Sequence, residues 1–317
     1  MNKEDLRIIF MGTPDFAVES LKALVENNYN VVGVITAPDK PAGRGYKLQP
    51  SAVKEYALSK GLHILQPSNL KNEVFLNELK RLEADIQVVV AFRMLPETVW
   101  SMPPRGTFNL HASLLPQYRG AAPINWAIIN GEKETGVTTF FLKHEIDTGE
   151  IIFQEKITIE NNDNVETVHN KLMALGAQLV LKTIDAVIDD SIQSQPQNLF
   201  FDNEKELKSA PKIFKETCEI DWNKPIQEIH NFVRGLSPYP AAWTELEING
   251  EKLNFKIFET KTVHKSHRLK LGELFTDNKT TLQIAAQDGL IDILDIQLSG
   301  KKRMKIKDFL NGFSFNS

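Results

Sequence analysis

The chain has 317 residues, of which 42% are hydrophobic and 25% are charged, and its formal net charge is −4 at pH 7. This composition is that of an ordinary globular protein with room for two domains, and it indicates neither a disordered chain nor a strongly basic nucleic-acid-binding one. The single cysteine, Cys218, cannot form an internal disulfide or a zinc cluster, and no apolar run approaches the roughly 20 residues of a membrane span. The polar first five residues contain no signal-peptide core, which favours a cytoplasmic location.

The first part of the chain alternates strand-like and helix-like patterns. Continuous apolar runs occupy residues 6–10, 31–35 and 86–92, and helical patterns between them occupy residues 51–60 and 72–82. Such runs are typical of strands buried on both faces of a parallel sheet. The alternation predicts a doubly wound, Rossmann-like α/β domain, which we place at residues 1–189. Gly12 stands alone where a dinucleotide fingerprint needs several glycines, so a nicotinamide cofactor is not expected.

The rest of the chain contains one long helical pattern and then many short strand patterns. Two strand patterns enclose a loop that contains Asp147, and Asp163 with Glu166 forms a capping-box pattern at the start of the long helix. We interpret the polar and charged stretch at residues 190–211 as a linker. Residues 212–317 alternate short apolar runs with turn signals, which predicts a small β-barrel.

Three polar side chains of complementary chemistry lie close together in the sequence. Asn109 and His111 are two residues apart in a strand-like segment, so their side chains should leave the same face, and Asp147 follows in the next loop. An amide can polarise a carbonyl, and an imidazole, with an ordinary pKa of about 6.5, can move a proton near neutral pH while a carboxylate orients it. A satisfied core histidine is the alternative interpretation of His111 considered alone.

Two groups of basic residues stand out in a chain whose net charge is negative. One lies in a Pro/Gly-rich loop and the other near the end of the chain; they comprise Lys40, Arg44 and Lys47, and Lys301, Lys302, Arg303 and Lys305. Considered alone, both groups are ordinary solvated surface. The alternative is contact with the phosphates of a nucleic acid, which would make binding strongly dependent on salt.

Three motifs, in this order and spacing, resemble the active-site motifs of the folate-dependent formyltransferases. They are the pair Asn109 and His111, the run from Ser113 to Pro116, and the pair Asp147 and Gly149. The resemblance extends from Ile8 to the last residues. It implies a formyl-transfer domain followed by an OB-like β-barrel, with 10-formyltetrahydrofolate as co-substrate and no metal. It also implies that Asn109, His111 and Asp147 are the catalytic residues.

The resemblance implies two segments that contact the folate. They are Ser113, Leu114, Leu115 and Pro116, and the loop residues Phe92, Arg93, Met94 and Leu95. The second segment departs from most family members, which have an Ala-Tyr-Gly pattern where this chain has Ala91-Phe92-Arg93. Backbone-mediated binding could survive this change.

The resemblance also bears on the formyl acceptor. In family members that act on charged initiator tRNA, a Pro-Ala-Gly-Arg-Gly loop enters the acceptor end of that tRNA, and Arg44 matches its arginine. This implies initiator Met-tRNA as partner, with contacts from Lys40, Arg44, Lys47, Lys212, Lys301, Lys302, Arg303 and Lys305. A monomer without an obligate protein partner is expected. The alternatives are a sugar-amine formyltransferase, a formyltetrahydrofolate hydrolase, and an RNA-binding protein with an inactive catalytic domain.

Overall fold

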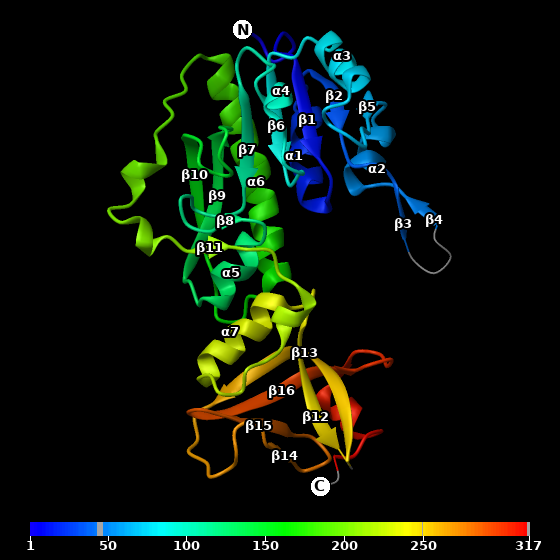
Figure 1. Cartoon of the computed structure of the whole chain (residues 1–317), viewed down its shortest axis with the longest axis vertical. Helices are drawn as coiled ribbons and strands as arrows, with labels where there is room; N and C mark the ends of the chain where they lie inside the picture. Colours follow the sequence, from blue (N-terminus) through cyan, green and yellow to red (C-terminus); the bar gives the residue numbers. More distant parts are fainter. Residues whose placement is uncertain (43–46, 249, 316–317) are drawn as a thin grey trace. The chain divides into compact units, whose positions relative to one another are not determined.

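The computed structural model describes residues 1–42, 47–248 and 250–315 of the chain (Figure 1). Two units are distinguished by their internal contacts. The first comprises residues 1–120, 136–157 and 169–209, and the second comprises residues 121–135, 158–168 and the chain from residue 210 onward. The domain boundaries that we place from the sequence, after residues 189 and 211, stay a prediction.

A seven-stranded sheet forms the centre of the first unit, in the order β10-β9-β7-β6-β1-β2-β5. Its strands are β1 (Ile8–Gly12), β2 (Val31–Ile35), β5 (Ile64–Leu65), β6 (Ile86–Val90), β7 (Thr107–His111), β9 (Glu134–Phe141) and β10 (Ile151–Thr158). The strands from β7 to β5 are parallel to their neighbours, whereas β9 runs antiparallel to β7. The predicted strand runs of the first domain are therefore present, and β1 and β6 are buried along their whole length, as apolar central strands require.

Helices on the two faces of this sheet complete the doubly wound arrangement. They are α1 (Asp15–Glu26), α2 (Ala52–Ser59), α3 (Glu73–Arg81), α4 (Glu97–Trp100) and the long helix α6 (Val165–Ile188). The part of α6 in this unit packs on β7, because a Cβ at Gly176 would lie only 2.7 Å from a methyl carbon of Leu110. It also reaches β9, where the hydroxyl groups of Thr139 and Thr183 are 2.9 Å apart. Figure 1 shows α6 running along these strands.

Short elements lie between these strands and helices. They are the hairpin of β3 (Lys40–Ala42) and β4 (Lys47–Gln49), the strand pair β8 (Arg119–Gly120) and β11 (Ser209–Ala210), and the 3₁₀ turns η1 (Gln197–Phe200) and η2 (Glu204–Glu206). The stretch that we interpret as a linker thus contains two turns. It also forms one isolated bridge to the sheet, between Gln195 and Ile151.

The first turn of α6 has a different cap from the one that the sequence suggests. The Asn164 side chain accepts a hydrogen bond from the Thr167 amide at 3.0 Å, and the Thr167 hydroxyl accepts one from the Asn164 amide at 2.9 Å. The expected capping residue, Asp163, instead accepts from the amide of Glu160. The predicted box of Asp163 with Glu166 is therefore wrong by one residue, because Asp163 is used to close the preceding turn.

The second unit is built on a curled antiparallel sheet in the order β12-β13-β16-β15-β14, with β17 on β16. Its strands are β12 (Ala242–Ile248), β13 (Glu251–Val263), β14 (Leu274–Thr276), β15 (Leu282–Ala286), β16 (Gly289–Leu298) and β17 (Met304–Lys305). Its helices and 3₁₀ turn are α5 (Pro123–Ile129), η3 (Lys215–Cys218), α7 (Ile226–Leu236) and α8 (Ile306–Leu310). The predicted fold class, a Rossmann-like α/β domain followed by a small OB-like β-barrel, is confirmed, and the barrel is a half-barrel formed by the curled antiparallel sheet.

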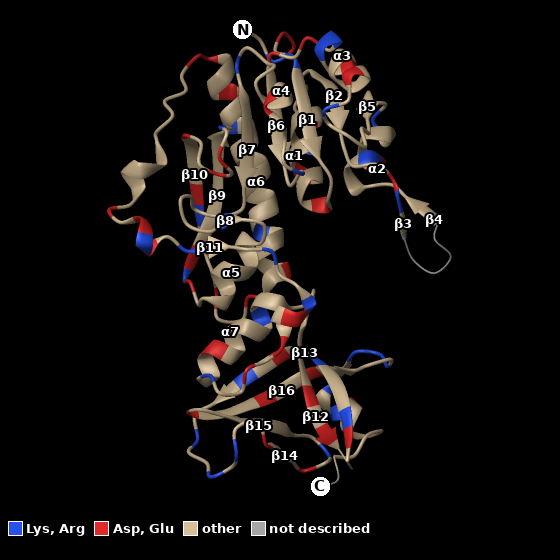
Figure 2. Cartoon of the chain, viewed as in Figure 1, with Lys and Arg blue, Asp and Glu red and all other residues tan. Residues whose placement is uncertain are grey.

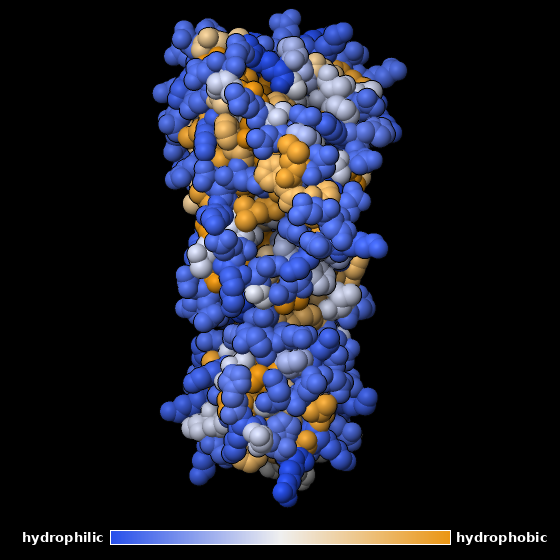
Figure 3. Space-filling view, turned by 90° about the vertical axis from the view of Figure 1, so that its left-hand side faces the viewer, coloured by the Kyte–Doolittle hydropathy of each residue, from blue (hydrophilic) through white to orange (hydrophobic). Residues whose placement is uncertain are grey.

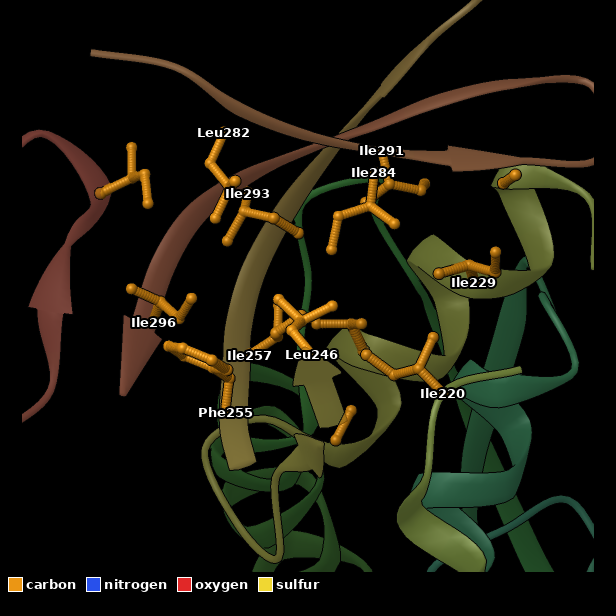
Figure 4. Close-up of a cluster of buried hydrophobic side chains, with 14 of the residues drawn as sticks. Ile220, Ile229, Leu246, Phe255, Ile257, Leu282, Ile284, Ile291, Ile293 and Ile296 are labelled. Atoms are coloured by element: carbon orange, nitrogen blue, oxygen red, sulfur yellow. The ribbon is translucent and has the colours of Figure 1, made fainter. Parts of the chain in front are cut away.

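Alternate residues of these strands form the hydrophobic core of the second unit. Figure 4 shows Ile257, Ile284, Ile291 and Ile293 of the sheet in one cluster with Ile229 of α7. Each of these five side chains is almost completely buried, as is Cys218 at the margin of the same cluster. Burial raises the pKa of the Cys218 thiol, as for a packing residue rather than a nucleophile.

The surface of the protein carries both hydrophilic and apolar side chains. The face shown in Figure 3 is largely hydrophilic, with several groups of apolar side chains, the largest of them in the upper half of the view. Among the described residues, none of the helices combines the length and apolar character that crossing a membrane requires.

Candidate active site

Strand β7 places Asn109 and His111 at the carboxyl end of the sheet. Asn109 lies between Val89 of β6 and Phe140 of β9 in the strand register. Because Leu110 faces α6, the alternation of a strand turns Asn109 and His111 to the opposite face. The amide of Asn109 is half-buried and has no hydrogen-bond partner among the described residues. It is therefore a polar group that is available to a ligand.

The two ring nitrogens of His111 have different surroundings. The side chain is only 7% exposed, and Nε2 lies 2.8 Å from the carbonyl oxygen of Tyr118. A carbonyl oxygen only accepts, so Nε2 carries the hydrogen, and Nδ1 is the basic atom in the neutral ring. Nδ1 lies 4.0 Å from Oδ2 of Asp147. The ring can therefore take up a proton at Nδ1, and the imidazolium that results would face a carboxylate.

Asp147 is held by the backbone of a neighbouring segment. Its Oδ2 accepts a hydrogen bond of 3.0 Å from the amide of Gly120, and its own φ is +54°, a region that aspartate tolerates better than most residues. Two residues later, a Cβ at Gly149 would lie 1.6 Å from the carbonyl oxygen of Phe141, so only glycine fits there. The structure thus brings together the carboxylate and the imidazole that the sequence places 36 residues apart.

Two polar side chains beside Asp147 were not anticipated from the sequence. Gln197 of η1 donates to the carbonyl oxygens of Asp147 and Gly149, and its side-chain oxygen accepts from Arg119. Burial lowers the pKa of the Arg119 guanidinium, and the charge of Asp147 opposes that effect. Arg119 lies three residues after the predicted site motif, which is a usable signal, whereas nothing local marks Gln197.

The run from Ser113 to Pro116 lies mostly in the interior. The hydroxyl of Ser113 donates to the carbonyl oxygen of Gln117 at 2.6 Å, and Leu115 packs with Phe140 and Ile151. Pro116 is also buried, and Leu114 is half-buried. The side chains of Ser113, Leu115 and Pro116 therefore hold the turn in place, so that a ligand would meet mainly backbone atoms and Leu114.

The loop after β6 presents a mixture of side chains. Phe92 and Leu95 are half-buried against the core, and Met94 is exposed. Arg93 donates to the carbonyl oxygens of Pro67 and Ser68 in the loop after β5, the second at 2.8 Å. Its guanidinium therefore ties two loops at the carboxyl edge of the sheet together, a role that the sequence does not reveal.

The predicted tRNA-contacting residues have several different environments. Lys40 is exposed on β3, Lys47 belongs to β4, and Arg44 lies outside the described residues. In the second unit, exposed Lys212 places its ammonium 5.3 Å from the centre of the Phe214 ring. An exposed aromatic ring with an adjacent cation is a surface on which a base could stack.

The four cations near the chain end differ in whether they form ion pairs with carboxylates. Arg303 forms an ion pair of 2.9 Å with the buried carboxylate of Asp295, and Lys305 pairs with Asp295 and Glu259. Within the described part of the chain, Lys301 and Lys302 have no carboxylate partner, and both are exposed. Figure 2 shows this blue loop beyond the end of β16. Only two of the four charges are therefore available to an external anion without breaking an internal pair.

The described residues contain no group of three or more histidine, cysteine, aspartate and glutamate side chains able to hold a metal ion. The site on β7 consists instead of an amide, an imidazole and a carboxylate at the carboxyl edge of a doubly wound sheet. These groups suit proton transfer and stabilisation of an oxyanion during group transfer at a carbonyl carbon.

A family model described as "Formyl transferase" matches residues 6–184, and one described as "Formyl transferase, C-terminal domain" matches residues 212–314. The chain therefore belongs to the formyl transferase family, and the resemblance seen in the sequence is confirmed. Its curated relatives include proteins named methionyl-tRNA formyltransferase from Parabacteroides distasonis, at 62% identity, and Phocaeicola vulgatus, at 64%. In both cases the match covers 99% of this chain and 97% of the relative.

Solved structures share the fold at lower identity. The N-formyltransferase of Helicobacter canadensis, in complex with folinic acid and dTDP-3-aminofucose, has a TM-score of 0.68 at 22% identity. The match covers 94% of this chain and all of that one. HypX of Aquifex aeolicus has a TM-score of 0.63 at 18% identity, and the match covers 98% of this chain but 49% of HypX. At these identities the likeness shows the common fold alone.

Proposed function

We propose that this protein transfers the formyl group of 10-formyltetrahydrofolate to the amino group of methionyl initiator tRNA, giving N-formylmethionyl-tRNA for translation initiation. The identity with relatives named methionyl-tRNA formyltransferase over nearly the whole chain carries the assignment of the acceptor. The site supports it, because the amide, imidazole and carboxylate are the groups that formyl transfer to an amine requires. The folate nitrogen supplies an activated formyl carbon.

His111 and Asp147 manage the protons in this proposal. The attacking amine must lose a proton, and Nδ1 of His111 is the basic atom that can receive it. Asp147, 4.0 Å away, stabilises the imidazolium that forms. The same ring then returns the proton to the nitrogen that leaves. Acid–base assistance of this kind typically accelerates a reaction by about 10²–10⁴.

Asn109 stabilises the charge that develops on the formyl oxygen. Its half-buried amide lies on the same face of β7 as His111, so its N–H groups can point at an oxyanion beside the ring. A donor of this kind is typically worth about 10²–10³ in rate. Asn109 and His111 thus divide the two tasks between them, and the strand fixes their spacing.

In this proposal the two segments and the basic residues described above bind the two substrates. We assign the folate to the loop of Phe92, Arg93, Met94 and Leu95 and to the turn of Ser113, Leu114, Leu115 and Pro116. For the tRNA we retain Lys40, Arg44, Lys47 and Lys212, together with the run of Lys301, Lys302, Arg303 and Lys305. Within that run we assign the phosphate contacts to Lys301 and Lys302, since the other two cations already have carboxylate partners.

The protein acts as a monomer in the cytoplasm in this proposal. All three proposed catalytic side chains come from a single chain, so that a second copy is not needed to complete the site. Charged initiator tRNA and the ribosomes that use it are cytoplasmic.

The test is transfer of labelled formyl from 10-formyltetrahydrofolate to three acceptors side by side. They are charged initiator Met-tRNA, charged elongator Met-tRNA and a panel of nucleotide-linked amino sugars. We expect formylation of the initiator Met-tRNA alone. Transfer to a sugar would move the substrate assignment to the sugar-amine enzymes, and release of formate without an acceptor would identify a hydrolase. Absence of any turnover would favour an RNA-binding protein with an inactive catalytic domain.

A further inference from the structure

A buried glutamine lies behind the loop that carries Asp147. The side chain of Gln197 is only 4% exposed, although it belongs to a stretch whose neighbours are mostly exposed. Its Nε2 donates to the carbonyl oxygens of Asp147 and Gly149, each at 2.8 Å. Its Oε1 accepts from Nε and Nη2 of Arg119 at 3.0 and 2.6 Å. Both hydrogens and both lone pairs of this amide are thus satisfied by groups around Asp147.

These bonds close a ring around Asp147. Arg119 is followed by Gly120, whose amide donates to the Asp147 carboxylate, and Gln197 joins Arg119 to the Asp147 carbonyl. The carboxylate and the backbone of one residue are therefore held from two sides by segments that are far apart in the sequence. Four charged groups interact here: Arg119, Asp147, Glu145 and Glu204.

The Asp147 loop needs an external support of this kind. Asp147 has a left-handed backbone, and the side chain of its neighbour Ile146 is 59% exposed rather than packed in a core. Apolar packing therefore does little to fix the loop. Hydrogen bonds from a buried and fully satisfied amide are directional, and they can hold a carbonyl to within a fraction of an ångström.

We propose that Gln197, oriented by Arg119, is a positioning residue that keeps the Asp147 carboxylate facing Nδ1 of His111. The inference deepens the proposed function and rests on it for the roles of these two residues. Gln197 does not touch the reacting atoms, and its effect passes through Asp147. On this account the stretch at residues 190–211 supports the active site through Gln197, in addition to connecting the two predicted domains.

The test replaces Gln197 with methionine, which has nearly the same size but cannot donate or accept these bonds. Loss of the tether should lower kcat for formyl transfer at least tenfold, with KM for both substrates changed less than threefold, because binding groups are untouched. Gln195→Met is the matched control, since that glutamine is exposed and lies two residues away. It should retain the kcat of the natural protein.

A second variant guards against a folding defect. Gln197→Glu keeps the size and the oxygen that accepts from Arg119, but it removes both donated bonds. If the unfolding temperature of Gln197→Glu equals that of the natural protein, its kcat should still fall about as much as that of Gln197→Met. Natural kcat in either folded variant, or an equal loss in the Gln195→Met control, would overturn the proposal.

A readout that does not depend on the acceptor separates this proposal from the proposed function. The surroundings of His111 can be followed by NMR of its ring nitrogens in the absence of substrates. Displacing the carboxylate should change the chemical shift of Nδ1 in Gln197→Met, because Oδ2 of Asp147 would no longer lie 4.0 Å from that atom. If the natural protein formylates no Met-tRNA but this chemical shift still changes, the positioning role stands and the substrate assignment fails. An unchanged chemical shift removes the positioning role, whatever the acceptor.

Discussion

At the scale of single residues, the proposed mechanism depends on which ring nitrogen of His111 is basic. The Tyr118 carbonyl oxygen accepts from Nε2, so the nitrogen proposed to exchange a proton is Nδ1, on the side of Asp147. Strand β7 turns Asn109, two residues before His111, to the same face. The roles that we propose for the three side chains rest on these two contacts and on this strand spacing.

Replacing His111 with glutamine tests this directly. Glutamine can still donate to the Tyr118 carbonyl oxygen but cannot exchange a proton, so kcat should fall by about 10²–10⁴ while the chain unfolds cooperatively. The measurements are steady-state formyl transfer and a thermal unfolding curve. His63→Gln is a control, because His63 is half-exposed beside Glu78 and should leave kcat unchanged. Turnover of His111→Gln within a factor of two of the natural value would remove His111 from the mechanism.

At the scale of elements, close backbone approaches decide where the Asp147 loop can lie. Gly149 sits where a Cβ would meet the carbonyl oxygen of Phe141 in β9, so the loop and the strand are in direct contact. Gly136, within β9, allows a similarly close approach to the carbonyl oxygen of Glu155 in β10. Glycines at these two points let the loop that carries Asp147 pack against the edge of the sheet.

Substitution of Gly149 with alanine should therefore destabilise the fold strongly. A Cβ placed 1.6 Å from a backbone oxygen forces the loop away from β9, and we expect a loss of about 3 kcal/mol or more in the free energy of unfolding. Formyl transfer should fall as well, because Asp147 moves with the loop. Chemical denaturation provides the first measurement. Gly312→Ala is the control, because that glycine meets nothing within 4 Å, and it should stay within about 0.5 kcal/mol.

The sequence predicts helices and strands better than it predicts helix caps and the hydrogen bonds between distant segments. Strands β1, β2 and β6 could be predicted because a strand buried on both faces must be apolar throughout. The structure caps α6 with Asn164 and Thr167, one residue after the predicted pair of Asp163 and Glu166. Several neighbouring side chains can cap a helix, and contacts in the folded chain decide which of them does. Gln197 could not be predicted, because its partners are about 50 and 78 residues away.

At the scale of the whole molecule, a net charge of −4 must be reconciled with a polyanionic partner. In Figure 2 basic and acidic residues are interspersed along the strands of the second unit. We therefore expect tRNA binding to depend on a few exposed loop cations that have no carboxylate partner among the described residues. The loop of Lys301 and Lys302 is the clearest of these, because Asp295 and Glu259 already neutralise Arg303 and Lys305.

The salt dependence of tRNA binding tests that assignment. The double variant Lys301→Gln/Lys302→Gln should bind charged initiator tRNA more weakly, and the slope of log affinity against log salt should fall by up to about 2. Folate binding should not change. The control Lys224→Gln/Lys252→Gln removes two cations that are paired with Glu228 and Glu245 in the same unit. Equal slopes for the natural protein and the Lys301→Gln/Lys302→Gln variant would exclude these lysines from the tRNA interface.

The sequence by itself determined the fold class and the family, and it pointed to the three candidate catalytic side chains. Hydrophobic periodicity and short motifs depend on residues that are close together in the sequence, so they can be recognised without the structure. Only the tertiary structure decided the proton-bearing nitrogen of His111, the tie from Arg93 to the loop after β5, and the burial of Gln197 beside Asp147. Each of these depends on a hydrogen bond between segments that meet only when the chain is folded. The identity of such a partner is set by three-dimensional packing rather than by neighbouring residues.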